Sequence, residues 1–487
     1  MWILRWMCWL SLLLSGHCGP GVMMRVSQKW LDYVRSEGTE VLRHMLLKDP
    51  LPDITGFTHM FGKVNYTISK VLIEEFDVPH TYAVPSPPTN VKFLVEDAKT
   101  KVFGQWKVKH WLVNDNGDFN LRLSGVSIAA VIRTFKDSSG RPSVLLSACH
   151  SEVKNAKVHL SGGASWLYNL FTVFLEKPIR NSVNEKLCPR VNEAVSILQR
   201  ELATFHATSR LDAKHEIDYS LINPPQVEET YIDLDLKGSV HPIGLSQYDN
   251  PPDIHIDLPN GRASMIYVGL TEYFFNSLAK NYFNSGVLKI SLTHEQFPHA
   301  FWLRTEGYVT IIPKIKSYYP TSQAMELILT ATKAPVVTLT PHNIILEMTG
   351  SLQGMAIMPY LITNEIFSVD MTATLISDKV HLSDLNLEVS FVSERLKFHG
   401  FRSSVEYINV AELENALEFS LRDSVLRGVN DGLLNGIPMP ALANITLQNT
   451  AITLSRDFML VSVDMYYIPW KELIKMLPPR SHIVPWT

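Results

Sequence analysis

The helix-like and strand-like segments of this chain occur twice in the same order, and this repeat constrains the fold more than any other feature. The first set opens with an apolar helical stripe over residues 22–47, which Pro50 ends. Alternating apolar and polar residues then predict strands over 63–160, and a long helix is expected over 164–206. The stripe of the first helix comprises Val26, Trp30, Tyr33, Val34, Val41, Leu42 and Met45.

The second set has the same layout. Residues 265–286 are apolar and helix-like, and alternating segments predict strands from 287 to about 405. A helix follows in which Leu413, Leu417, Leu421 and Val425 recur every fourth residue. The chain then returns to strands over 445–454 and 458–468. The repeat predicts two similar domains of the α+β class.

A proline-rich segment, residues 223–260, separates the two sets and is typical of a connection between domains. The stretch 230–238 within it alternates like a strand. We therefore expect the following boundaries: a signal peptide over 1–18, domains over 19–222 and 261–468, the connection over 223–260, and a tail over 469–487.

Three local patterns give sharper expectations. Asn116-Gly117 is a hairpin turn signal between strands. Pro178 and Pro189 are expected to kink or break the long helix. Asp233 and Asp235 lie two residues apart on a predicted strand, so both point to one face. That face is interpreted as a solvated one, with an acid/base pair as the alternative.

Long alternating strands beside strongly apolar helices imply a sheet that curls around each helix. A sheet curled around a long helix leaves an elongated apolar seam, and such a seam suits acyl chains.

The first residues of the chain are typical of a secretory signal peptide. Arg5 precedes a nine-residue apolar run from Trp6 to Leu14, which is too short to span a bilayer, and small residues follow it. Cleavage near Cys18 would release a secreted, extracellular protein. The alternative is a buried N-terminal helix, although this segment has no amphipathic pattern.

The removal of Cys8 and Cys18 with that peptide leaves Cys149 and Cys188. In an oxidising compartment the remaining pair predicts one disulfide, and two separate buried thiols are the alternative. Sequons at Asn65 and Asn444 predict N-glycosylation.

The charge pattern argues against nucleic acid as a partner. The net charge of −4 divides into +1 from Arg5, +4 over residues 19–225 and −9 over 226–487. This charge is too dilute for a nucleic-acid surface, but the mildly basic first half allows contact with anionic surfaces. The sequence contains no nucleophile elbow and no phosphate-binding loop. His294 and His299 stand five residues apart with Pro298 between them, whereas two zinc ligands on one helical face stand four residues apart. We expect no catalytic residue, no metal and no cofactor other than bound phospholipid.

Several long blocks resemble the family of bactericidal/permeability-increasing protein (BPI) and lipopolysaccharide-binding protein, in the right order and over residues 21 to about 467. GVMMRVSQKWLDYVRSEG (21–38) is similar to the family's opening helix, and MIYVGLTEYFFNSLAKNYFNSGVLKI (265–290) to the opening of its second domain. GGASWLYNLF (162–171) resembles the second long helix, and GIPMPALANITLQNTAITL (436–454) the stretch before the last strand. Cys149 and Cys188 match the family's single disulfide.

This resemblance implies a boomerang of two similar BPI-type domains, each a long helix wrapped by a twisted antiparallel sheet, joined by a central sheet. It also implies one phospholipid-sized apolar pocket in each domain. The ligands would be phospholipids or bacterial lipopolysaccharide, and contact with membranes or micelles would be peripheral. Candidate pocket residues in the first domain are Val22, Val26, Leu167, Leu170 and Phe171.

Some family members carry a strongly basic tip on the first domain. Here the corresponding stretch, 97–117, keeps four lysines that are candidates for an anionic-lipid site, with an ordinary solvated strand face as the alternative: Lys99, Lys101, Lys107 and Lys109.

Three functions fit the sequence. The first is a lipid carrier or sensor of innate defence. The second is an interaction protein whose lipids are structural, and the third is a plasma-type protein that transfers phospholipid or cholesteryl ester.

Overall fold

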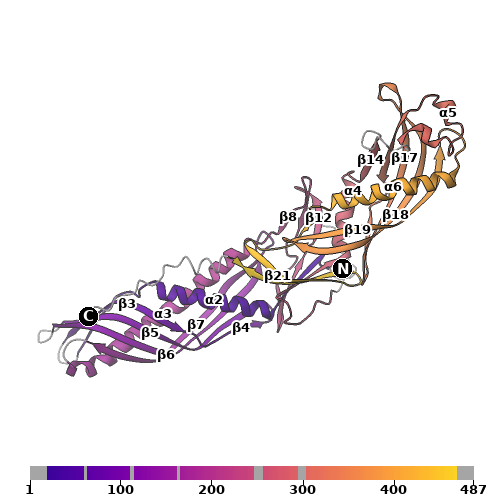
Figure 1. Ribbon diagram of the computed structural model, residues 1–487. Coiled ribbons are helices and arrows are strands. Elements are labelled where there is room, and N and C mark those ends of the chain that lie inside the picture. Colours follow the sequence, from indigo (N-terminus) through magenta and orange to yellow (C-terminus); the bar gives the residue numbers. More distant parts are fainter. Residues whose placement is uncertain are drawn as a thin grey trace, which may run out of the picture.

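The computed structural model describes residues 19–59, 63–109, 114–161, 165–245, 256–293 and 303–468. The expected signal peptide and tail therefore lie outside the described residues, as do His294 and His299. The molecule is elongated, with one domain at each end and a sheet between them (Figure 1).

The central sheet has six antiparallel strands and joins segments from the beginning, the middle and the end of the chain. Its order is β10-β11-β1-β13-β22-β21. The strands are β1 (Val22–Ser27), β10 (Gln226–Val227), β11 (Tyr231–Leu236), β13 (Ile266–Thr271), β21 (Ile445–Leu454) and β22 (Phe458–Tyr467). A second small sheet has the order β12-β9-β8 and consists of β8 (Thr208–Arg210), β9 (His215–Asp218) and β12 (Ser239–Pro242).

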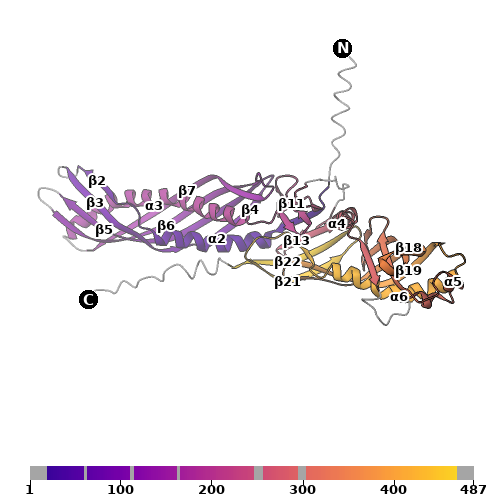
Figure 2. The same ribbon diagram turned by 90° about the horizontal axis from the view of Figure 1, so that it is seen from above.

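The pairing of β1 with β13 explains the elongated shape. Val22 pairs with Leu270 and Val26 with Ile266, so the two strands run antiparallel. Each strand leads directly into a helix, α2 (Gln28–Lys48) or α4 (Glu272–Asn284). The two helices therefore leave the central sheet in opposite directions, and each directs one domain outward, as Figure 2 shows.

The helix expected over 22–47 begins six residues late, because its first residues form β1. The helix expected at 265–286 is present as α4 but likewise begins late, at Glu272, since Ile266–Thr271 is β13. In β1, hydrogen-bonding partners on both sides come from β11 and β13, which follow about 200 residues later in the chain. Such a central strand is stabilised by hydrogen bonds to strands that are distant in the sequence, and the local pattern of apolar residues gives no sign of that pairing.

The first domain is a six-stranded antiparallel sheet that curls around two helices. The order is β2-β3-β5-β6-β7, with β4 paired to β5. Its elements are β2 (Ile54–Thr58), β3 (Val64–Asp77), β4 (His80–Ser86), β5 (Asn90–Lys109), β6 (Asn114–Lys136), β7 (Pro142–Ser161) and α3 (Ser165–Leu202).

Helix α3 continues through Pro178 and Pro189, so the expected break is absent. Its buried residues recur at every fourth position and pack against the inner face of the sheet. This stripe compensates for the hydrogen bonds that the prolines remove. It consists of Leu175, Ile179, Val183, Leu187, Val191 and Val195.

The second domain repeats this arrangement with a seven-stranded sheet of order β14-β15-β17-β18-β19-β20, in which β16 pairs with β17. The expected helix is confirmed as α6 (Val410–Gly432), and its four predicted stripe residues are at most 2% exposed. The other elements are β14 (Lys289–Thr293), β15 (Ala324–Ala331), β16 (Val336–Leu339), β17 (Ile344–Ile357), β18 (Thr363–Ser383), β19 (Asn386–Ser403), β20 (Ile437–Pro438), α5 (Ile315–Tyr318) and the 3₁₀ turns η2 (Thr305–Tyr308) and η3 (Pro359–Leu361).

Asn116-Gly117 is not a hairpin turn but part of β6, where Gly117 pairs with Trp106 of β5. A Cβ atom at Gly117 would lie 2.3 Å from the Ser161 carbonyl oxygen and 3.0 Å from the indole nitrogen of Trp106. The glycine therefore permits close packing across three strands, a role that sequence alone does not separate from a turn. The connection from β5 to β6 spans residues 110–113, outside the described ranges.

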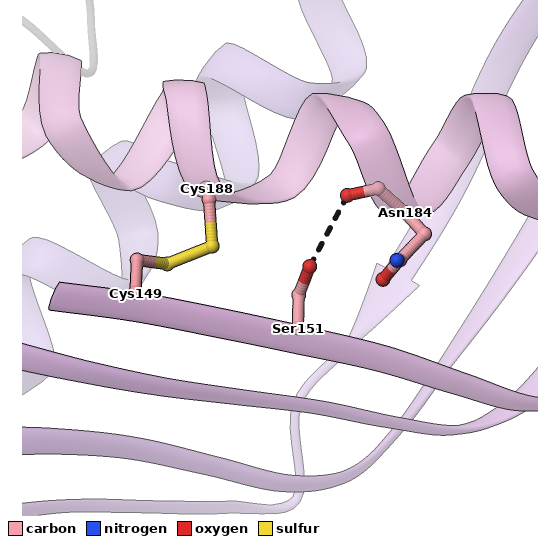
Figure 3. Close-up of a disulfide and its surroundings, with 4 residues drawn as sticks. All are labelled: Cys149, Ser151, Asn184 and Cys188. Atoms are coloured by element: carbon pink, nitrogen blue, oxygen red, sulfur yellow. Dashed lines mark hydrogen bonds between the residues drawn. A yellow bond between two sulfur atoms is a disulfide. The ribbon is translucent and has the colours of Figure 1, made fainter.

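A disulfide joins Cys149 of β7 to Cys188 of α3, with Cα atoms 5.8 Å apart, in agreement with the pairing that the resemblance implies (Figure 3). Beside it, the Ser151 hydroxyl donates a hydrogen bond of 3.2 Å to the Asn184 carbonyl. Together these contacts attach the long helix to the sheet.

The interpretation of Asp233 as part of a solvated face was wrong. Arg25 of β1 lies opposite Asp233 of β11, and its guanidinium donates hydrogen bonds of 2.7 and 2.8 Å to the two carboxylate oxygens. Both side chains are buried. Asp235 is also mostly buried, and burial together with the neighbouring Asp233 raises its pKa. The partner of Asp233 stands 208 positions away in the chain, so the local pattern gave no sign of it.

None of the helices in the described part of the chain combines the length and apolar character needed to cross a bilayer.

Candidate functional site

Two largely apolar cavities lie where the helices of each domain approach the central part of the molecule. The first, cavity 1, lies between α2, the second half of α3 and the central sheet. Its volume is about 230 Å³. Its wall includes Met24 and Val26 of β1, Trp30 and Val34 of α2, Val195 and Leu198 of α3, Ile232 and Leu234 of β11, and Val461 and Val463 of β22.

The wall of cavity 1 follows from two sequence patterns. Every second residue of β1 points to this side, as do the residues opposite in β11. The apolar stripe of α3 continues beyond Val195 to Leu198 and Leu202. Gly38 of α2 and Ala194 of α3 also belong to the wall, and small side chains at these positions leave space open.

Polar groups are few in cavity 1. Among its described lining residues, only Arg35, Thr134 and Ser143 carry polar side chains, and only Arg35 is charged. Thr134 donates its hydroxyl to the Thr89 carbonyl, so it is already paired. The cavity therefore offers an apolar interior with one cationic group.

The second cavity, cavity 2, lies between α4, the end of α6 and the sheet of the second domain, and has a volume of about 380 Å³. The repeat thus produces two cavities in related positions. Its apolar wall includes Phe275, Leu278 and Ala279 of α4, Leu346 and Met348 of β17, Phe391 of β19, and Val425 and Val429 of α6.

Cavity 2 differs from cavity 1 in carrying a carboxylate. Asp212 accepts hydrogen bonds from the Tyr282 hydroxyl at 2.5 Å and from Nδ1 of buried His215 at 2.9 Å. Burial alone would raise the pKa of Asp212, but these bonds and two backbone N–H groups lower it below its usual range. Burial and Asp212 in turn raise the pKa of Tyr282. Asp212 is therefore anionic at neutral pH, and Lys289 is the other charged residue of the described wall.

Of the five residues expected in the first pocket, Val26 lines cavity 1. Val22 does not: it is fully buried between Leu236 and Leu270, where the strands pack tightly against Gly238. Leu167, Leu170 and Phe171 belong to the first turns of α3, but their side chains lie outside the described part of the structure. At 1.5 Å per residue, those turns lie roughly 30 Å along the helix from the segment that lines cavity 1.

The sequence reasoning missed the second half of α3 and the contribution of β11, β13 and β22. The four-residue stripe that runs through both prolines of α3 could have identified the helical part of the wall. The strand part depends on pairing between distant segments and has no local signal.

The four candidate lysines all lie on the exposed face of β5, where they alternate with buried residues. Lys101 forms an ion pair of 2.6 Å with Glu75 of β3, and Lys99 stands opposite Asp77. Lys107 and Lys109 stand opposite Thr67 and Asn65. The row is thus cationic but interrupted by acidic neighbours at one end.

Asn65 and Asn444 of the two sequons are both exposed. Glycosylation at these positions stays a prediction. Within the described ranges, no group of three His, Cys, Asp or Glu side chains is arranged to hold a metal ion.

Comparison with known proteins gives a consistent result. The model of the LBP / BPI / CETP family matches with its N-terminal domain over residues 30–199 and with its C-terminal domain over 209–467. The chain is 30% identical to bactericidal permeability-increasing protein of Sebastes schlegelii, with 94% of this chain and 99% of that protein covered. It is 31% identical to human BPI fold-containing family C protein, with 95% and 91% covered.

A solved structure is similar over the same range. The crystal structure of lipopolysaccharide binding protein covers 92% of this chain and 99% of its own, with a TM-score of 0.63 and 26% identity. The two curled antiparallel sheets and the central sheet described above agree with that fold.

Proposed function

The chain belongs to the LBP / BPI / CETP family, and from this we propose that it is a secreted, non-enzymatic lipid carrier of innate defence. Its ligands are phospholipids or bacterial lipopolysaccharide, whose acyl chains occupy the two cavities. The observation that carries this proposal is the nearly continuous apolar lining of cavity 1, and the names of relatives that refer to lipopolysaccharide support that ligand.

The energetics favour acyl chains as the main source of affinity. Two acyl chains bring about 30 methylene groups, and burial of each is worth roughly 0.8 kcal/mol. Association and ordering cost on the order of 4–15 kcal/mol, which leaves a large surplus. An exposed ion pair supplies only about 0–1 kcal/mol, so the lysines of β5 would direct the approach to anionic surfaces without providing most of the affinity.

The disulfide between Cys149 and Cys188 supports secretion, because such bonds persist in oxidising compartments. The proposed route is the signal peptide over residues 1–18. We propose no cofactor besides the bound lipid, and only peripheral contact with membranes or micelles.

Identification of the bound lipid tests the proposal. Protein secreted from eukaryotic cells is extracted, and its lipids are identified by mass spectrometry. Diacyl phospholipid or lipid A supports the carrier, neutral esters would support the transfer protein of the plasma branch, and absence of lipid would contradict both.

A matched pair of variants locates the lipid. Ala194 lines cavity 1, whereas Ser196 is exposed on the same helix. Ala194→Trp should fill the cavity and lower the lipid content of the folded protein by about one molecule, while Ser196→Trp should leave it unchanged. Equal amounts of bound lipid in the two folded variants would mean that the lipid does not bind in cavity 1.

A further inference from the structure

The two cavities differ in the charge of their walls. In the described wall of cavity 1 the only charged side chain is Arg35, whereas the wall of cavity 2 contains Asp212 and Lys289. A charge in an otherwise apolar wall has few competing partners, so it acts strongly on any charged group that a ligand brings next to it. This difference bears on which lipid headgroup each cavity accepts.

Arg35 adjoins both cavity 1 and solvent. The side chain belongs to the wall, and 28% of it remains exposed. Long basic side chains commonly place their methylene groups on an apolar surface and keep the charged end in water. A lipid in cavity 1 with its acyl chains inward would present its headgroup to the same region.

The guanidinium is oriented but not saturated. Nη1 donates to the Thr81 hydroxyl at 2.6 Å and to the Thr81 carbonyl at 3.3 Å, and Nε lies 3.7 Å from an oxygen of Asp32. Within the described residues Nη2 makes no hydrogen bond. Asp32 is itself 42% exposed and accepts a hydrogen bond from Gln28, so it neutralises Arg35 only in part. Donors therefore remain for an anionic group.

We propose, on the basis of the lipid-carrier function above, that Arg35 makes cavity 1 selective for lipids with a phosphate-bearing headgroup. The guanidinium fork matches the oxygens of a phosphate and binds them with charge-assisted hydrogen bonds. Thr81 holds the fork in place, so little ordering is required when the lipid enters.

Cavity 2 lacks this preference. Its carboxylate, Asp212, is kept anionic by the hydrogen bonds from Tyr282 and His215 and repels a phosphate at close range. Lys289 offsets this charge but does not replace a positioned guanidinium, because an ammonium is a single point charge on a flexible stem. Anionic lipids should therefore be distributed unequally between the two cavities.

The test uses the full-length chain with Ala279→Trp, which fills cavity 2, so that the retained lipid reports on cavity 1. The protein is incubated with vesicles of equal parts dioleoylphosphatidylglycerol and dioleoylglycerol, reisolated and analysed for bound lipid. Arg35→Gln should lower the ratio of phosphatidylglycerol to diacylglycerol by roughly ten-fold, the effect of one hydrogen bond to a charged group. Total lipid per chain should stay the same, and Arg35→Lys should restore part of the ratio.

The outcomes separate this inference from the general function. An unchanged ratio in Arg35→Gln, with lipid retained, overturns the selectivity of Arg35 and leaves the carrier function intact. Absence of both lipids from the wild-type protein would overturn the carrier function itself. If the Arg35–Thr81 contact only stabilised the fold, Arg35→Gln would lower the bound amounts of both lipids equally. That result would also contradict the proposal.

Two further arms complete the test. If Arg35→Gln does not fold, Arg35→Lys and the shape-matched Arg35→Met are compared in its place. A parallel incubation with lipid A identifies the source of the phosphate. Displacement of phosphatidylglycerol by lipid A that depends on Arg35 indicates a bacterial ligand, whereas no displacement indicates a phospholipid. Both outcomes agree with the proposed selectivity for phosphate.

Discussion

The buried ion pair between Arg25 and Asp233 should be a main determinant of the stability of the central sheet. Arg25 donates two hydrogen bonds to Asp233 and a third, of 2.5 Å, to the Leu258 carbonyl, and its guanidinium lies 3.7 Å from the centre of the Tyr231 ring. Burial opposes the charge, but Asp233 raises the pKa of Arg25 above its usual value. The guanidinium of Arg25 therefore stays charged in the folded protein.

Replacement of one partner should cost far more than replacement of both. Asp233→Ala leaves the guanidinium buried with only a carbonyl and a ring as partners, and loss of one member of a buried pair costs about 3–5 kcal/mol. That is a large fraction of a typical folding free energy of about 5–15 kcal/mol. The double variant Arg25→Met/Asp233→Leu removes both charges and should recover most of the loss.

Urea unfolding alone does not isolate this effect, because a chain with several domains need not unfold in one step. Hydrogen exchange measured by mass spectrometry on peptides from β1 and β11 reports directly on the central sheet. Asp233→Ala should accelerate exchange there and leave β17 and β18 unchanged. A loss below about 1 kcal/mol, or a double variant no more stable than the single one, would refute the reasoning.

Three further predictions follow from named contacts. The double variant Cys149→Ser/Cys188→Ser should lose about 4 kcal/mol of unfolding free energy, the chain-entropy value for a closed loop of this length. Titration of the unfolded, unreduced wild-type protein should find no free thiol, and two titratable thiols would contradict the disulfide. Burial alone would raise the pKa of Asp464, but hydrogen bonds from Asn449, Lys29 and the Met265 amide lower it. The stability that this carboxylate contributes is present above its usual pKa and is lost as pH falls below about 4, so Tm should fall more steeply between pH 5 and 3 in wild type than in Asp464→Asn; equal slopes would contradict this. The four β5 lysines are neutralised together in Lys99→Gln/Lys101→Gln/Lys107→Gln/Lys109→Gln. This variant should bind anionic vesicles more weakly, and its binding should depend less on salt. Unchanged binding would indicate an ordinary solvated face.

The sequence predicts what depends on neighbours in the chain. The stripe of Leu413, Leu417 and Leu421 identified α6, and its residues are buried as expected. The repeat predicts two similar domains and the two remaining cysteines predict one disulfide, and the resemblance adds the overall arrangement. By contrast, the local pattern predicts a helix where β1 lies, because the strands that pair with β1 follow more than 200 residues later. It predicts a solvated Asp233 for the same reason.

Prolines and glycines were the other source of error. Pro178 and Pro189 are usually helix breakers, yet α3 gains more from its continuous apolar stripe than it loses in backbone hydrogen bonds. Gly117 is usually a turn signal next to Asn116, yet here it makes room for Trp106. In each case tertiary packing outweighs a local preference.

The position of the cavities follows from the same repeat that gives the fold. In each domain the cavity lies at the end of the second long helix, over Val191 to Leu202 in α3 and over Val425 to Gly432 in α6. These helix ends reach the region where the curled sheet of the domain gives way to other strands, so the wrapping of the apolar stripe is incomplete there. Small residues keep this region open in both halves, Gly38 and Ala194 in one and Gly428 and Gly432 in the other. Two independent sets of residues therefore leave space unfilled at corresponding places in the two domains, as a repeat of the same layout in both halves of the sequence would produce.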